Sequence, residues 1–219
     1  MTKREKTELL STLKSRLKEL YPNAVCALEY GGDPWRLLIM TRLSAQCTDA
    51  KVNTVSKELF TKYPTLEDLA AADYDDVADI IRPCGLWRRK SYDIVNISVR
   101  LFVDYHGTVP GSMSELLTLP GVGRKTANLI LGDVFGKDAV VCDTHFIRIM
   151  ARFGMYPLTQ KSAEKIEFII RDLTDVSDGS DFCHRVITLG REYCTAISPD
   201  CQFCPLSDIC PRCGVGGKA

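Results

Sequence analysis

The sequence lacks an apolar run long enough to cross a membrane, and it lacks an excess of charge of either sign. Its 28 basic and 28 acidic side chains among 219 residues give a formal net charge of zero. This balance argues against strong non-specific binding to nucleic acid, which a basic surface favours. The charged start of the chain, residues 1–6, is not followed by the uninterrupted apolar segment of a secretory signal. We therefore expect a cytoplasmic protein that does not associate with membranes.

Evidence for β-strands is also scarce, and the sequence has no repeat of 20–50 residues and no low-complexity tract. The longest strand candidate, residues 140–141, is too short to count as one. Apolar residues instead recur every three or four positions, as the leucines between residues 4 and 21 do. The same spacing predicts further helices near residues 35–43, 52–60, 77–81, 94–102, 146–153, 162–173 and 182–194. We predict an all-α fold.

Basic side chains gather locally despite the zero net charge. One group contains four basic residues between residues 82 and 90, and two pairs are Arg124 with Lys125 and Arg148 with Arg152. Such a group is usually the solvated face of a helix, and charge pattern alone does not distinguish that from a binding surface.

Two glycines stand out in residues 119–127, which read LPGVGRKTA. Gly121 and Gly123 lie two positions apart, where glycine permits a positive φ and lets another group approach the backbone closely. Apolar spacing on either side predicts a helix, a glycine hairpin and a second helix. The free N–H groups of the hairpin and of the following helix start form a site for a phosphate.

Lys125 falls in the first turn of that second helix, where the helix dipole disfavours an ammonium group. If this lysine is partly desolvated, its pKa falls and its amine becomes a nucleophile. Asp143 precedes another helical run, so it is a candidate N-cap. An amine and a carboxylate at two helix starts can share one cleft. The two residues fit simpler roles equally well, as a phosphate-binding or solvated lysine and a plain cap.

Ten cysteines are a high number for an intracellular protein. Four near the end of the sequence have the spacing C-x6-C-x2-C-x5-C and can surround one metal centre: Cys194, Cys201, Cys204 and Cys210. Zinc and an iron–sulfur cluster both accept four thiolates. A competing register uses Cys213 in place of Cys194, with a spacer shorter than the usual zinc-ribbon gap. A set of disulfides is disfavoured because no secretory signal is present.

These segments together resemble the endonuclease III family, which are DNA glycosylases with abasic-site lyase activity. The matching segments span nearly the whole chain and are residues 43–46, 85–87, 119–128, 143–145 and the four cysteines. The resemblance implies a two-lobed helix-hairpin-helix fold with DNA in the cleft between the lobes. Residues 23–136 would form a helical bundle with the hairpin. Residues 1–22 plus 137–219 would form a second lobe with a C-terminal cluster loop.

The resemblance also implies a role for each matching residue. Lys125 is the nucleophile that forms a Schiff base with deoxyribose, and Asp143 stabilises positive charge on the sugar. Gln46 fills the hole left by an extruded base, and Leu86 is a wedge opposite the lesion. Judged from sequence alone, a glutamine at such a position is more often bonded to loop backbone, and a leucine is more often part of the core. The remaining implied DNA contacts are Gly121, Gly123, Arg124 and His145, and the implied ligands of a [4Fe-4S] cluster are Cys194, Cys201, Cys204 and Cys210.

The implied enzyme is a monomeric, nucleoid-associated DNA glycosylase that removes oxidised pyrimidines from damaged double-stranded DNA and cleaves abasic sites in base excision repair. One alternative is the adenine glycosylase branch, which lacks the hairpin lysine and carries an added C-terminal domain. Another is a non-catalytic DNA-binding or redox-sensing module. The sequence departs from the family pattern at residues 195–200, which contain no lysine or arginine where relatives carry basic residues. We therefore expect weaker or differently placed DNA contacts from this loop.

Overall fold

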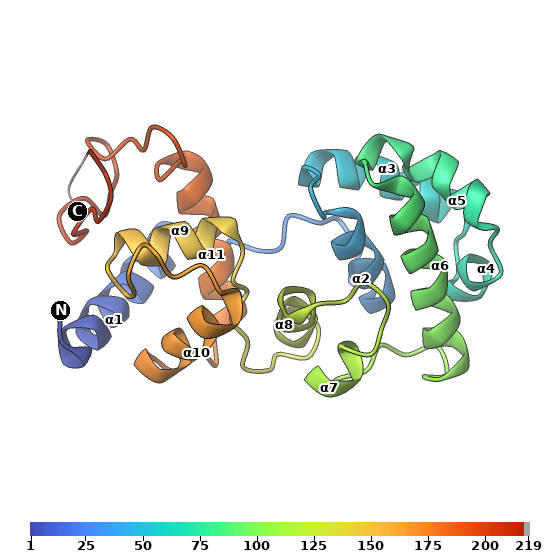
Figure 1. The fold of residues 1–219 in the computed structure, drawn as a ribbon, viewed down its shortest axis with the longest axis horizontal. Helices are drawn as coiled ribbons and strands as arrows, with labels where there is room; N and C mark the ends of the chain where they lie inside the picture. The colour runs from blue at the N-terminus through green and yellow to red at the C-terminus, as the bar shows by residue number, and fades with distance from the viewer. Residues whose placement is uncertain (217–219) are drawn as a thin grey trace. The chain divides into compact units, whose positions relative to one another are not determined.

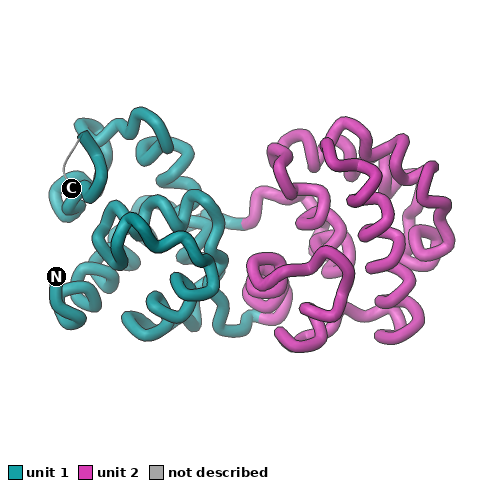
Figure 2. Tube along the Cα trace, viewed as in Figure 1, with its two compact units in different colours: residues 1–25, 136–219 teal, residues 26–135 magenta. Residues whose placement is uncertain are grey.

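The computed structural model describes residues 1–216, which form eleven α-helices and one 3-10 helix without a β-strand in that range (Figure 1). The prediction of an all-α fold is confirmed. The chain separates into two compact units (Figure 2). Unit 2 is residues 26–135, and unit 1 combines residues 1–25 with the described residues from 136 onward. The domain boundaries predicted from the sequence stay a prediction. No described helix is both long and apolar enough to span a bilayer.

Unit 2 is built around helix α2, whose ten residues are mostly buried, as its nearly continuous apolar sequence predicts. The long helix α6 packs against α2, α4 and α5, and α8 packs against α2 and α7. In chain order the elements of this unit are α2 (Pro34–Leu43), α3 (Asp49–Lys62), α4 (Leu66–Ala70), α5 (Tyr74–Ile81), the 3-10 helix η1 (Arg82–Cys84), α6 (Trp87–Val103), α7 (Met113–Leu116) and α8 (Arg124–Asp133).

Unit 1 brings together segments from distant parts of the sequence, because α1 packs against α10 and α11. Its helices are α1 (Lys3–Leu20), α9 (Thr144–Arg152), α10 (Ala163–Leu173) and α11 (Gly179–Glu192). Helix α11 begins three residues before the predicted start at residue 182. At this first residue the backbone passes close to a neighbouring segment: a Cβ on Gly179 would lie 1.8 Å from the carbonyl oxygen of Ala139, so only glycine fits there.

Side-chain caps fix several helix starts. The Thr48 hydroxyl accepts a hydrogen bond from the Lys51 N–H at 3.4 Å and caps α3. Thr65 forms a capping box with Asp68 at the start of α4. Asp33 occupies the N-cap position of α2 but makes no capping bond, and its carboxylate instead lies 3.5 Å from Arg36 Nε. These caps set where the loops that carry the candidate site residues begin and end.

Candidate functional site

The predicted glycine hairpin joins α7 to α8 in unit 2 (Figure 1). Gly121 adopts φ +66°, and Gly123 is the N-cap of α8 in an extended conformation. No side chain caps α8, which leaves its first-turn N–H groups to other acceptors. A Cβ on Gly123 would meet no atom within 4 Å. The backbone at Gly123 is therefore open to a foreign group, as a phosphate site requires.

An ion pair lies directly beneath Gly121. Arg42 on α2 contacts Asp93 on α6, with Nη2 2.7 Å from Oδ2, and Asp93 is only 1% exposed. Arg89 adds a second contact, with Nε 3.1 Å from Asp93 Oδ1. A Cβ on Gly121 would lie 2.6 Å from both Arg42 Nε and Asp93 Oδ2. Glycine is thus required here twice, by the backbone conformation and by the ion pair.

Lys125 lies in the first turn of α8, two residues after Gly123, as predicted. Its side chain is exposed to solvent in the protein alone. The packing of unit 2 therefore does not bury this amine. Exposure does leave the amine accessible to a large substrate.

Gln46 and Leu86 both adopt the left-handed conformation that non-glycine residues rarely use, with φ 56° and φ 50°. Gln46 lies in the junction between α2 and α3, and Leu86 is the N-cap of α6. Leu86 is 55% exposed, so it does not belong to the core. Strained residues with exposed side chains are commonly found at functional sites.

Lys90 connects the two segments that carry Gln46 and Leu86, and nothing in the sequence analysis singled it out for this role. Its Nζ donates hydrogen bonds to the carbonyl oxygens of Leu43, at 2.8 Å, and of Cys84, at 2.9 Å. The side chain is fully buried. The reading of Lys90 as part of a solvated basic face is therefore wrong: backbone acceptors 47 and 6 residues away hold its charge inside unit 2.

Asp143 caps α9 in unit 1, as predicted. Its Oδ1 accepts a hydrogen bond from the Phe146 N–H at 2.7 Å, and the residue is half-buried. His145 packs against α11, where a Cβ on Gly190 would lie 2.6 Å from His145 Nδ1. Burial, opposed by the charge of Asp143, lowers the pKa of His145. A neutral imidazole results at neutral pH, which suits a packing role better than the binding of an anion.

Arg148 and Arg152 also turn out not to form a solvated basic face. Arg148 donates to the carbonyl oxygen of Cys194 from Nε, at 3.0 Å, and from Nη2, at 2.8 Å. Arg152 is 9% exposed and donates from Nη1 to Cys194 Sγ, at 3.1 Å, and to Thr195 O, at 2.7 Å. The backbone carbonyls of the loop that follows α11 have no helical partners and need other hydrogen-bond donors. The two guanidinium groups supply these donors and so hold the loop in place.

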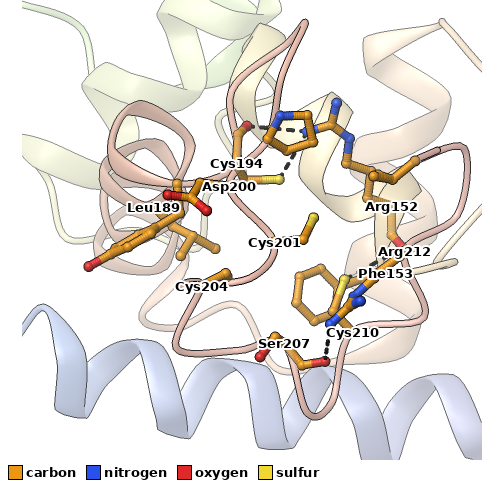
Figure 3. Close-up of a pocket in the computed structure, with 13 residues that line it drawn as sticks. Arg152, Phe153, Leu189, Cys194, Asp200, Cys201, Cys204, Ser207, Cys210 and Arg212 are labelled. Carbon is orange, nitrogen blue, oxygen red and sulfur yellow. Dashed lines mark hydrogen bonds between the residues drawn. The ribbon is translucent and has the colours of Figure 1, made fainter.

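The four predicted cysteine ligands line a single cavity in unit 1 (Figure 3). Arg152 reaches Cys194 from one side, as the dashed lines in Figure 3 show. The lining consists of Arg152, Phe153, Leu189, Tyr193, Cys194, Pro199, Asp200, Cys201, Cys204, Ser207, Cys210, Arg212 and Val215. Cys194 is part of this wall, whereas Cys213 is absent from it and lies near Gly154. The register that includes Cys194 therefore fits the cavity.

The spacing of the sulfur atoms bears on the group that this cavity fits. Within residues 1–216, no three of the four sulfurs lie within 4.8 Å of one another. Four thiolates around one zinc ion would be about 3.8 Å apart. Burial raises the pKa of the Cys204 thiol and raises that of Cys210 to about 11, so both need a nearby positive charge to ionise. Four sulfur donors that are less tightly grouped than a single zinc ion requires fit a multinuclear cluster better than one ion.

Contacts from α1 fix the outer side of the cysteine loop. Arg16 donates from Nη2 to the carbonyl oxygen of Pro205 at 2.7 Å, and its Nη1 lies 3.0 Å from Asp208 Oδ2. Leu206 is the one fully buried apolar residue of the loop between Cys201 and Cys210. With so little apolar burial, the loop depends on these polar contacts and on whatever its cysteines bind.

The chain has extensive similarity to known proteins. A family model described as HhH-GPD superfamily base excision DNA repair protein matches residues 39–175. Endonuclease III of Bacillus subtilis (strain 168) is 39% identical over 195 residues, 89% of this chain and 88% of that protein. Endonuclease III of Synechocystis sp. is 40% identical over 210 residues, 95% of this chain and 93% of that protein. A solved structure of a trapped endonuclease III–DNA covalent intermediate matches with a TM-score of 0.88 and 37% identity, covering 97% of each chain.

Proposed function

The chain belongs to the endonuclease III family of HhH-GPD base excision DNA repair proteins, and we propose on this basis that it is a bifunctional DNA glycosylase. It removes oxidised or ring-broken pyrimidines, such as thymine glycol, and then cleaves the abasic site through a lysine Schiff base. It acts as a monomer on damaged double-stranded DNA, in the cytoplasm and associated with the nucleoid.

The observation that carries this proposal is the position of Lys125. Its amine is exposed, in the first turn of a helix that begins at an uncapped glycine hairpin. The hairpin amides at Gly121 and Gly123 would hold a backbone phosphate and so bring the neighbouring sugar within reach of the amine. A relative has been trapped as a covalent intermediate with DNA, which supports a nucleophile on the protein in this family.

In the proposed reaction, the neutral Lys125 amine attacks C1′ of the damaged nucleotide and the base departs. The amine nitrogen loses a proton and the sugar ring opens to give a protonated Schiff base. Removal of a proton from C2′ then expels the 3′ phosphate by β-elimination. Water finally hydrolyses the imine and regenerates Lys125. Bound DNA would supply the desolvation of the amine that the free protein lacks.

Asp143 is the second proposed catalytic group. Its Oδ1 is held by the Phe146 N–H at 2.7 Å, which fixes the orientation of the carboxylate. A fixed carboxylate stabilises positive charge that develops on the sugar as the base leaves. The capping hydrogen bond of Asp143 would thus also orient its negative charge toward the sugar.

Gln46 and Leu86 are proposed to enter the DNA stack when the damaged nucleotide leaves it. Both side chains are exposed on left-handed turns of unit 2, and Lys90 ties the two turns together. Filling the hole and wedging the opposite strand would offset part of the cost of unstacking. Arg124 and His145 remain predicted DNA contacts, with the neutral state of His145 arguing for a minor role.

We also propose that Cys194, Cys201, Cys204 and Cys210 hold a [4Fe-4S] cluster. The shared cavity supports a common metal centre, and the absence of any three of the four sulfurs within 4.8 Å of one another supports a cluster over zinc. When bound, the cluster supplies cross-links that stabilise a loop with little apolar burial. Arg152 donates hydrogen bonds to the carbonyl oxygens of Thr195 and Ala196 in the non-basic segment at residues 195–200. This segment therefore helps to hold the loop in place.

Borohydride trapping on a duplex with one abasic site tests the assigned nucleophile. Wild-type protein should form a covalent complex and cleave the strand, whereas Lys125→Ala should do neither while still binding the duplex. Lys57→Ala, which removes another exposed lysine of unit 2, is the matched control and should behave as wild type. A cross-link that persists in Lys125→Ala would contradict the assignment. Duplexes with thymine glycol or an undamaged thymine then test base removal.

A further inference from the structure

Lys90 extends from α6 with its side chain fully buried, and its amine meets the ends of two other helical elements of unit 2. Its Nζ donates to the carbonyl oxygen of Leu43, the last residue of α2, at 2.8 Å. It also donates to the carbonyl oxygen of Cys84, the last residue of η1, at 2.9 Å. Carbonyls at a helix end lack partners within the helix, and the dipole of α2 favours a cation at this end. The amine therefore bridges α2 and η1.

Each bridged carbonyl lies shortly before one of the left-handed turns. On the α2 side, Gln46 follows the bridged carbonyl by three positions, and a hydrogen bond from Cys47 N–H to Ser44 O, at 3.1 Å, encloses it. On the η1 side, Leu86 follows the bridged carbonyl by two positions. The carbonyl oxygen of Leu86 accepts a hydrogen bond from the backbone N–H of Lys90 at 3.0 Å. Short hydrogen-bonded segments thus connect both turns to the same lysine.

The ion pair of Arg42 with Asp93 joins α2 to α6 beside this bridge. Arg42 directly precedes Leu43 on α2, and Asp93 follows Lys90 by three positions on α6. The two groups are in contact, with Arg42 Nη2 2.7 Å from Asp93 Oδ2. Loss of the Lys90 amine would therefore leave the two helices joined, while it would release the two carbonyls from which the turns begin.

We propose that Lys90 is a positioning residue that determines how well the protein distinguishes damaged from undamaged DNA. This inference rests on the proposed function, in which Gln46 and Leu86 enter the DNA stack at the lesion. Lys90 is fully buried, so it acts only through the two turns. By fixing the distance between them before DNA binds, it spares the complex the cost of ordering both side chains at one gap in the stack. Undamaged DNA has no such gap, so its binding does not depend on this distance.

Lys90→Met tests the role, because methionine is apolar, of similar length and donates no hydrogen bond. Affinities of the full chain are measured by fluorescence anisotropy at one salt concentration, for a duplex with one abasic analogue and for the same duplex undamaged. We expect the variant to lose about 10-fold in affinity for the abasic-analogue duplex and less than about 2-fold for the undamaged one. Ser98→Ala removes another buried hydrogen bond of α6, to Ile94 O at 3.0 Å, and should keep the wild-type ratio of affinities.

A second comparison separates positioning from a general disturbance of unit 2. In a chain with Gln46→Ala and Leu86→Ala, the side chains through which Lys90 acts are gone. Adding Lys90→Met to that chain should change its affinity for the abasic-analogue duplex by less than about 2-fold. A general disturbance would lower the affinity equally in both backgrounds. If Lys90→Met does not fold, Lys90→Gln, which places a neutral amide on a shorter side chain, replaces it with the same expectations.

Several results would refute the positioning role. One is an equal loss of affinity for damaged and undamaged duplexes, and another is no loss for either. A full additional loss in the chain that already lacks both side chains would also refute it, as would equal affinity of wild type for the two duplexes. Failure of wild type to form a borohydride-trapped complex with abasic-site DNA would instead count against the proposed function, because that assay reports the nucleophile and not the ratio of affinities.

Discussion

Asp93 and Gly121 lie so close that one carboxylate oxygen of Asp93 occupies the position next to a missing Cβ, 2.6 Å from where that atom would be. The ion pair of Asp93 with Arg42 thereby supports the glycine hairpin from below. The hairpin is held by a buried charge pair on α2 and α6 as well as by its own turn geometry. This relationship separates the roles of the two hairpin glycines.

Gly121→Ala and Gly123→Ala should therefore have different effects. The first introduces a side chain at φ +66° against the ion pair and should lower the free energy of unfolding by about 2 kcal/mol, measured by chemical denaturation. The second meets open space at a negative φ and should change that free energy by less than about 1 kcal/mol. If the hairpin amides hold phosphate, Gly123→Ala should nonetheless weaken duplex binding. Equal stability of both variants would contradict the role given to the ion pair.

Asp143→Asn should separate catalysis from helix capping. Asparagine is as good an N-cap as aspartate, so the stability of α9 should be preserved. Loss of the negative charge should slow base excision by about 100-fold or more while duplex binding is kept. Ser162→Ala, which removes the cap of α10, is the control and should cost about 1 kcal/mol of stability with excision unchanged. Single-turnover kinetics on a thymine glycol duplex would measure the effect, and normal excision by Asp143→Asn would remove it from the mechanism.

Arg152→Lys should impair retention of the proposed [4Fe-4S] cluster. Arginine donates from its planar group to Cys194 Sγ, Thr195 O and Ala196 O, and lysine cannot reproduce this geometry. We expect less iron per protein and faster loss of visible absorbance in air. Arg100→Lys, which changes an exposed pair with Asp104, is the control and should retain iron as wild type does. Retention of iron by Arg152→Lys at the wild-type level would show that the cysteines alone hold the loop.

His145 should make the stability of the protein dependent on pH on the acid side of neutrality. Burial lowers its pKa below the ordinary value of 6.5. As pH falls below 6.5, the unfolded chain binds a proton at this residue that the folded chain does not, so the free energy of unfolding decreases. His145→Gln should reduce this decrease below pH 6.5, as followed by denaturation at each pH.

The features that sequence reasoning predicted well are local ones. The hairpin, the first-turn position of Lys125 and the Asp143 cap each depend on a few adjacent residues, and their local preferences agree with the fold. The four-cysteine spacing is local too, and all four residues reach one cavity.

The features that it missed depend on partners far away in the sequence. Lys90 belongs to a group of basic residues that suggested an exposed helix face. It is buried instead, and the carbonyl oxygen of Leu43, 47 residues earlier, accepts a hydrogen bond from its amine. Arg148 and Arg152 have helical spacing that suggests one exposed face, yet Cys194 O, 46 residues later, turns Arg148 inward. No periodicity or propensity reports where such backbone acceptors lie, so only the folded structure reveals them.

The contacts of Arg16 with Pro205 and Asp208 join the first helix of unit 1 to its cysteine loop, across 189 and 192 residues. During synthesis on the ribosome, unit 2 is a continuous stretch that has emerged in full once residue 135 leaves the exit tunnel. Helix α1 is synthesised first, but the residues of the cysteine loop that Arg16 contacts are synthesised only near the end of the chain. If the four cysteines hold the proposed cluster, iron delivery should be among the last events of maturation, and a shortage of iron should leave unit 2 folded and unit 1 incomplete.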